Sequence, residues 1–120
     1  MGRARWRRSS RAPRHGERSL LFFGGEHTHA ILRPAALSAR PGYDPTLAEP
    51  LTSTEEERAF ARKVLAATGF ELLYARVDMA RDERGALRLM ELEITEPNLF
   101  LHQGGPGAVR GLVDALLARL

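Results

Sequence analysis

The sequence contains no cysteine among its 120 residues. This absence excludes disulfide bridges, a thiolate nucleophile and any zinc site built on cysteine. The chain also lacks a run of about 18 apolar residues, so we expect no membrane-spanning helix. Its arginine-rich start has no apolar stretch of the kind that a secretory signal requires. These features lead us to expect a cytoplasmic protein.

Charge is distributed unevenly along the chain, whose formal net charge is +3. Residues 1–18 hold seven of the 18 Lys+Arg and one of the 15 Asp+Glu, so residues 19–120 carry a net charge of −3. Residues 1–15 are rich in arginine around Trp6 and poor in apolar residues, which predicts a disordered tail. Such a tail can bind nucleic acid through phosphates, but nothing in it indicates base reading, so a nucleic-acid partner is not expected.

Residues 16–120 have room for one domain. Two apolar runs at 19–23 and 28–32 flank Gly24 and Gly25, which predicts a β-hairpin. Residues 34–52 contain four prolines and little periodicity, so we predict a loop or linker there. His27 and His29 lie two residues apart, which would place them on one face of a strand as a metal pair or, as we favour, as two exposed histidines.

Two helices are predicted. The first begins at a cap formed by Ser53 or Thr54, with Glu56 or Glu57 completing a capping box, and ends at Gly69. Its apolar face comprises Phe60, Ala61, Val64 and Leu65, which should cover the sheet on the side away from the acids. The second helix runs over about 108–120, after a glycine-rich turn at 104–107. Its apolar stripe, predicted to be core, comprises Val109, Leu112, Val113, Leu116, Leu117 and Leu120.

The most informative stretch is 74–98, where two alternating runs flank a polar turn containing Gly85. The alternation predicts a β-hairpin. A turn centred between Arg84 and Gly85 sets Asp78 opposite Glu91 and Arg76 opposite Glu93, with side chains within about 5 Å.

Strict alternation along this hairpin also predicts which residues share a face. Leu87 and Leu89 would lie on the same face as Glu91 and Glu93. The opposite face of this strand would carry Arg88, Met90, Leu92 and Ile94.

Like charges placed opposite one another destabilise a sheet, so Asp78 and Glu91 need a cation beside them. Arg76 supplies one positive charge and a divalent metal would supply two. Oxygen ligands without nearby cysteine suit Mg²⁺ or Mn²⁺, which bind substrate phosphates. The alternative is a solvated hairpin face, whose surface ion pairs contribute about 0 to 1 kcal/mol each.

The Ala-Arg-Val-Asp segment at 75–78, followed by Leu-Met-Glu-Leu-Glu at 89–93 and Glu-Pro-Asn-Leu-Phe at 96–100, resembles the C-terminal metal-binding hairpin of ATP-grasp ligases. The resemblance is to the glutathione-synthetase-like and cycloserine-biosynthesis-like branch. It implies that Asp78, Glu91 and Glu93 hold Mg²⁺ ions that bridge ATP phosphates, and that Arg76 steadies the phosphorylated intermediate. Many members have Asn where this chain has Glu93, and a carboxylate there can still bind Mg²⁺.

Residues 16–34 are similar to the central antiparallel strands of the same family, through a motif that is less specific. This match implies that Glu17, His29 and Arg33 lie near the nucleotide or acceptor site. Asn98 would lie at the edge of the metal site.

The resemblance implies an α+β fold, in which an antiparallel sheet is backed by two helices as an incomplete C-terminal ATP-grasp subdomain. The implied function is that of a C-terminal fragment of an ATP-dependent carboxylate–amine ligase, with ATP, Mg²⁺ or Mn²⁺ and a carboxylate substrate as its ligands. The lysines and glycine-rich lid of the family would lie upstream, and Lys63 is the one lysine of this chain. We therefore do not expect ligase activity from the isolated chain.

Further expectations concern partners. An apolar surface left exposed where the absent half would dock predicts self-association. Two alternatives stay open from the sequence: a non-catalytic module that pairs with a partner chain, and a nucleic-acid binder with a basic tail.

Overall fold

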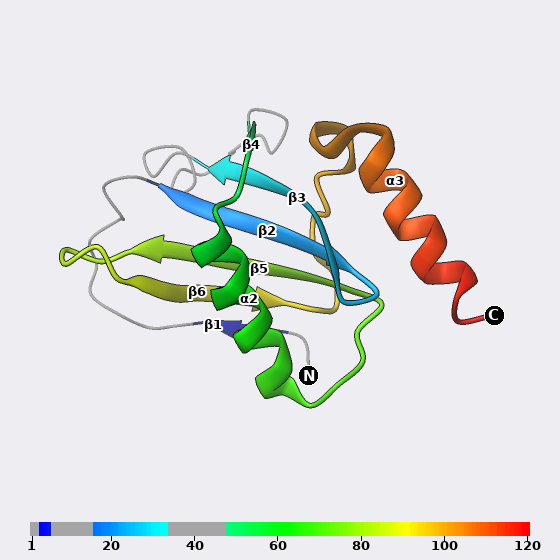
Figure 1. The fold of residues 1–120 in the computed structure, drawn as a ribbon, viewed down its shortest axis with the longest axis horizontal. Coiled ribbons are helices and arrows are strands. Elements are labelled where there is room, and N and C mark those ends of the chain that lie inside the picture. The colour runs from blue at the N-terminus through cyan, green and yellow to red at the C-terminus, as the bar shows by residue number, and fades with distance from the viewer. Residues whose placement is uncertain (1–2, 6–15, 34–47) are drawn as a thin grey trace.

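The computed structural model describes residues 3–5, 16–33 and 48–120. This part of the chain forms a six-stranded antiparallel sheet and two helices, which confirms the predicted α+β class (Figure 1). The strands lie in the order β1-β6-β5-β2-β3-β4. Their bounds are β1 Arg3–Arg5, β2 Glu17–Phe23, β3 Glu26–Arg33, β4 Glu49–Leu51, β5 Tyr74–Arg81 and β6 Leu87–Glu93. The helices are α2 Glu55–Thr68 and α3 Leu101–Leu117.

Two segments that we predicted to be irregular contribute edge strands. Arg3–Arg5 pair with β6, so the predicted disorder of 1–15 does not hold for these three residues. Glu49–Leu51 pair with β3, which corrects the prediction of a loop over 34–52. Both strands gain regular structure by pairing with a sheet edge, which a local pattern does not reveal. The rest of the predicted tail and residues 34–47 lie outside the described residues.

The β2–β3 hairpin is confirmed, and its turn residues Gly24 and Gly25 have φ of 59° and 84°. The pairing shifts by one residue between Leu21, which faces His29, and Phe22, which faces His27. Thr28 is therefore the extra residue of a β-bulge. Because neighbouring residues on β2 point to opposite faces, the bulge sends His27 and His29 to opposite faces of the sheet.

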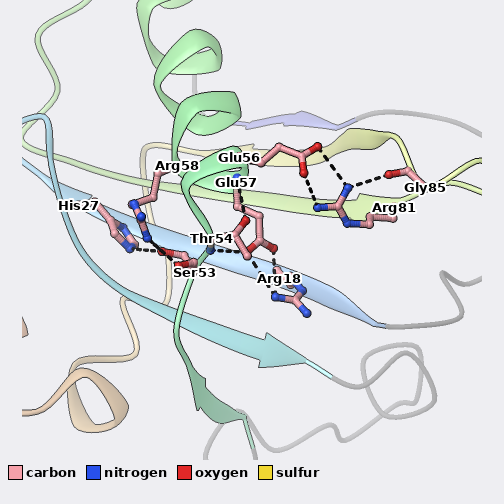
Figure 2. Close-up of polar contacts among 9 residues, drawn as sticks. All are labelled: Arg18, His27, Ser53, Thr54, Glu56, Glu57, Arg58, Arg81 and Gly85. Atoms are coloured by element: carbon pink, nitrogen blue, oxygen red, sulfur yellow. Dashed lines mark hydrogen bonds and ion pairs between the residues drawn. The ribbon is translucent and has the colours of Figure 1, made fainter.

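Helix α2 begins and ends as predicted. Thr54 is the N-cap residue, and its hydroxyl accepts a hydrogen bond from the backbone amide of Glu57. In return, the Glu57 carboxylate accepts a hydrogen bond from the backbone amide of Thr54. Gly69 ends the helix in a left-handed conformation, with φ of 71°. Figure 2 shows Arg18 reaching Glu57 from β2, with 3.1 Å between Arg18 Nη1 and Glu57 Oε2. The capping box is thus tied to the sheet by an ion pair.

The helix α2 crosses one face of the sheet (Figure 1). Its buried Ala61 shares a core with the even-numbered residues Leu20 and Phe22 of β2 and with Val77 and Met79 of β5. The predicted apolar residues Phe60, Val64 and Leu65 pack against this core. A second cluster contains Leu21, Ile31, Ala48 and Phe100. Since Leu20 and Leu21 are consecutive on a strand, the two clusters lie on opposite faces of the sheet.

The β5–β6 hairpin has the predicted pairs but a different turn. Hydrogen bonds from the Gly85 amide to Asp82 O and from the Asp82 amide to Ala86 O close a three-residue loop centred on Arg84. A bulge at Met90 then adds one residue to β6, because Asp78 faces Glu91 while Met79 faces Leu89. Leu87 and Leu89 consequently pack against the α2 core and not beside the acids, which corrects the predicted faces.

Helix α3 differs from its prediction in both length and orientation. It begins at Leu101, ahead of the predicted start, and is broken at Gly105, whose φ of 70° and ψ of −164° are not helical. The predicted break in the glycine-rich segment 104–107 is therefore present, but a short helical segment precedes it. Its buried residues are Ala108 and Ala115, and it contacts mainly β3. We predicted that the apolar residues of this helix belong to the core, but five of them are 44–100% exposed. These five, here named the α3 stripe, are Val109, Val113, Leu116, Leu117 and Leu120.

Candidate functional site

The polar residues of the β5–β6 hairpin meet on one buried patch of the sheet. Arg76 pairs with Glu93 and Asp78 pairs with Glu91 across the two strands, as predicted. All four are buried, with Asp78 at 0% exposure and the others at 3–7%. A solvated hairpin face is therefore the wrong interpretation for these residues.

Asp78 is held by two guanidinium groups. Arg76 donates Nε to Oδ1 and Nη2 to Oδ2, each at 3.0 Å, in a bidentate pair. Arg33 donates Nη2 to Oδ2 at 2.7 Å from the other side. Bidentate, charge-assisted hydrogen bonds of this kind are among the strongest in proteins. The carboxylate thus has two positively charged partners in a place that excludes solvent.

The same Arg33 nitrogen donates to Glu17 Oε2 at 2.8 Å. Glu17 faces Arg33 in the β2–β3 register, whereas Asp78 faces Ser19 on the other side of β2. Arg33 therefore crosses β2 to reach β5. The structure joins Glu17 and Arg33, which we named from the less specific motif, to the hairpin residues Arg76 and Asp78 in one ion network.

The segment after β6 packs against Arg76. Nη1 of Arg76 lies 3.3 Å from the Asn98 carbonyl oxygen, and the Arg76 guanidinium lies 5.8 Å from the centre of the Phe100 ring. The side-chain oxygen of Asn98 accepts a hydrogen bond from the Phe100 amide at 3.0 Å. Asn98 is therefore next to the site, as predicted, but its side chain supports the local turn. Its role as a cofactor ligand stays a prediction.

His29 connects β3 to the start of α3. Its Nε2 lies 2.9 Å from the Leu99 carbonyl oxygen and its Nδ1 lies 2.7 Å from Thr28 Oγ1. Burial lowers the pKa of His29 below 6.5, against the raising effect of backbone hydrogen bonds at Leu99 and Phe100. His29 lies on the face of the ion network and anchors the segment that contacts Arg76.

His27 lies on the opposite face. It contacts the Phe22 ring, with 5.2 Å between ring centres, and its Nε2 lies 2.9 Å from Ser53 Oγ (Figure 2 shows His27, Ser53 and the neighbouring Arg58). Both histidines are partly buried. The prediction that they share one face, as a metal pair or as exposed side chains, is therefore wrong.

Asp78, Glu91 and Glu93 are the candidate ligands of a divalent metal ion. Their oxygen donors suit Mg²⁺ or Mn²⁺, and the register brings them to one patch. Their present arrangement does not form a ligand set, because Arg76 and Arg33 use both oxygens of Asp78. Within 3–5, 16–33 and 48–120, no three Asp, Glu or His side chains are grouped so as to hold a metal ion.

One residue of this patch was missed by sequence reasoning. Ser19 faces Asp78 on β2, is fully buried, and its hydroxyl has no hydrogen-bond partner among the described residues. Alternation with Glu17 on the same strand is the signal that could have identified it.

Three comparisons with known proteins bear on identity. No family model matches the chain. The cycloserine biosynthesis protein DcsG of Streptomyces lavendulae is 36% identical over 116 residues, which cover 89% of this chain and 38% of DcsG. The crystal structure of D-cycloserine synthetase DcsG superimposes with a TM-score of 0.77 at 34% identity, covering 90% of this chain and 39% of that one.

A more distant likeness concerns the fold. The ATP-grasp ligase PsnB, in a structure with a phosphomimetic variant of its minimal precursor, Mg and ADP, matches with a TM-score of 0.60 at 15% identity. The match covers 86% of this chain and 32% of PsnB. Neither a nucleic-acid binder nor a non-catalytic module is supported by these similarities. Neither α2 nor α3, the helices of the described residues, has the length and apolar character to span a bilayer.

This chain spans about two fifths of the length of DcsG. Homology to DcsG and the shared fold of PsnB agree with the resemblance that the hairpin motif indicated. Over about nine tenths of its length the chain is therefore similar to a part of DcsG, and it shares the fold of the ATP-grasp ligase PsnB.

Proposed function

We propose that this chain supplies the metal- and phosphate-facing hairpin of an ATP-dependent carboxylate–amine ligase. The observation that carries this proposal is the convergence of Arg76, Asp78, Glu91 and Glu93 on one buried patch. Burying four ionisable groups is costly, and such clusters are concentrated at functional sites. The homology to DcsG supports a ligase over other users of a buried ion network.

Each residue has a proposed role. Asp78, Glu91 and Glu93 would hold Mg²⁺ or Mn²⁺, which neutralises charge on ATP phosphates when bound. Arg76 would steady the phosphorylated carboxylate through its guanidinium, which Asn98 and Phe100 already orient. Glu17, His29, Arg33 and Asn98 would border the nucleotide or acceptor.

The residues that bind the nucleotide would lie elsewhere than on this sheet. Lys63 lies exposed on α2, the helix that covers the face opposite the ion network. The match to 38% of DcsG is consistent with a division in which the remaining part holds the nucleotide. We therefore expect no ligation of a carboxylate to an amine by this chain alone.

Titration of Mn²⁺, with free Mn²⁺ measured by electron paramagnetic resonance in the presence and absence of ATP, tests the proposal. We expect binding by the wild-type chain to be weakened about tenfold or more in Glu91→Gln, because one charged ligand is lost. Glu71→Gln is the matched control, since Glu71 is exposed outside the ion network. Binding by Glu91→Gln as strong as that of the wild type would remove the metal role, provided that circular dichroism shows both chains folded.

A further inference from the structure

The Arg33 guanidinium occupies a site on the Asp78 carboxylate that a metal ion would also use. Its Nη2 lies 2.7 Å from Asp78 Oδ2 and 2.8 Å from Glu17 Oε2, and its side chain is 12% exposed. Asp78 Oδ2 also accepts from Arg76 Nη2 at 3.0 Å. One carboxylate oxygen therefore carries two positively charged donors, which leaves no place on it for a third cation.

The network around Arg33 is incompletely satisfied. The Arg33 Nε is buried and has no hydrogen-bond partner among the described residues, and the same holds for the Ser19 hydroxyl. Ser19 is directly opposite Asp78 in the β2–β5 register. Buried polar groups are nearly always paired, so these two atoms are exceptions that need a physical explanation. The Ser19 hydroxyl could donate to Asp78 once Arg33 has left.

We propose that Arg33 is a competing internal cation, which occupies the metal position of Asp78 and must be displaced when a divalent ion binds. This inference rests on the proposed metal role of Asp78 and Glu91. Asp78 Oδ2 already accepts from both Arg33 Nη2 and Arg76 Nη2, so a divalent ion can bind this oxygen only in place of one of these donors. Arg33 thus acts on the site as a positioning residue that sets its metal affinity.

Arg33 and not Arg76 is the group that leaves. Arg76 makes two parallel hydrogen bonds to Asp78 and is further held by the Asn98 carbonyl and the Phe100 ring. Arg33 reaches Asp78 through a single nitrogen, which it shares with Glu17. Withdrawal from Asp78 therefore breaks one hydrogen bond of Arg33 and leaves its ion pair with Glu17 in place.

The experiment measures Mn²⁺ affinity by electron paramagnetic resonance in an Arg33→Met variant of the chain, which keeps the aliphatic stem of the side chain and removes its charge. We expect binding about tenfold tighter than in the wild type, because a like charge beside the ion is lost. Arg81→Met is the matched control: it removes the same charge from the far end of β5, where Arg81 pairs with Glu56 on α2. Arg33→Gln provides a second variant if Arg33→Met does not fold.

Ser19→Ala adds an independent signature. We expect the metal-free variant to be at least as stable as the wild type, since an unpaired hydroxyl is removed, but to bind Mn²⁺ less tightly. Equal, Glu91-dependent binding by the wild type and Arg33→Met would overturn this inference and leave the proposed function in place. Absence of Glu91-dependent binding from both chains would overturn both proposals.

Discussion

At the scale of single residues, Asp78 holds the buried charges together. Its carboxylate is fully buried and is the shared acceptor for Arg76 and Arg33. The pairing offsets a large desolvation cost, so removing one partner leaves the others uncompensated. The stability of the sheet should therefore depend more on this carboxylate than on any exposed ion pair.

We expect Asp78→Asn to lower the free energy of unfolding by about 3–5 kcal/mol, because Arg76 and Arg33 each lose a charged acceptor at a buried position. The matched control is Glu56→Gln, which breaks an exposed ion pair with Arg81 and should cost about 0–1 kcal/mol. Urea denaturation followed by circular dichroism measures both. An equal effect of the two substitutions would contradict the importance given to the buried network.

His27 should make stability depend on pH. Burial lowers its pKa below 6.5, with nearby Arg58 as a further lowering influence and the hydrogen bond to Leu21 as a raising one. The unfolded chain then takes up a proton at a higher pH than the folded chain. Stability is therefore complete above pH 6.5 and is lost as the pH falls from there toward the lower pKa of the folded state.

Urea midpoints measured between pH 7.5 and 5 check this expectation, with a decrease toward acid that becomes shallower in His27→Gln. His102 is exposed and provides the matched control, since His102→Gln should keep the wild-type slope. A wild-type midpoint that rises toward pH 5 would reverse the sign and refute the prediction.

At the scale of elements, helix α3 packs through its small residues. A Cβ added to Gly111 would lie 2.7 Å from Thr28 Cγ2, and one added to Gly104 would lie 2.7 Å from the His29 ring. Ala108 and Ala115 are buried on the same helix. Close approach of small residues brings α3 against β3, and this explains why the larger residues of the α3 stripe remain outside.

Two glycine substitutions on this helix should therefore have opposite effects. Gly111→Ala should destabilise the chain by about 1–3 kcal/mol, because the added methyl group overpacks the contact with Thr28. Gly107→Ala meets no atom within 4 Å and should be neutral or stabilise the helix by up to about 1 kcal/mol. Thermal unfolding of both variants checks this contrast, and destabilisation by Gly107→Ala alone would show that the helix packs differently.

At the scale of the whole molecule, the described residues include an apolar surface that is exposed to solvent. The α3 stripe includes Leu117 at 61% and Leu120 at 100% exposure. Contiguous exposed apolar residues of this kind usually mark an interface. The chain also spans about two fifths of DcsG, so residues that correspond to the rest of DcsG lie outside this match.

We expect the isolated chain to self-associate through the α3 stripe, with an apparent mass that rises with concentration in size-exclusion chromatography with light scattering. A Val113→Glu/Leu117→Glu variant should be monomeric over the same range, because charges would be buried in the contact. Phe70→Ser is the matched control, since Phe70 is 58% exposed but lies outside the stripe. A monomeric wild type at high concentration would refute this expectation.

Local signals determined much of this molecule from sequence alone. The capping box of Thr54 and Glu57, the stop at Gly69 and the pairing of Asp78 with Glu91 follow from interactions between near neighbours in the chain, which sequence spacing encodes. The acid pairs were correct although the turn was not, because the bulge at Met90 restored the register that the three-residue loop had shifted.

Tertiary structure alone decided the rest. The bulges at Thr28 and Met90 change the face on which the residues beyond them lie, and α3 begins at Leu101 with a helical segment that precedes the break at Gly105. Arg33 meets Asp78 across an intervening strand, 45 residues away in sequence. These features depend on contacts between distant segments, whose energies outweigh local propensity and leave no periodic trace in the sequence.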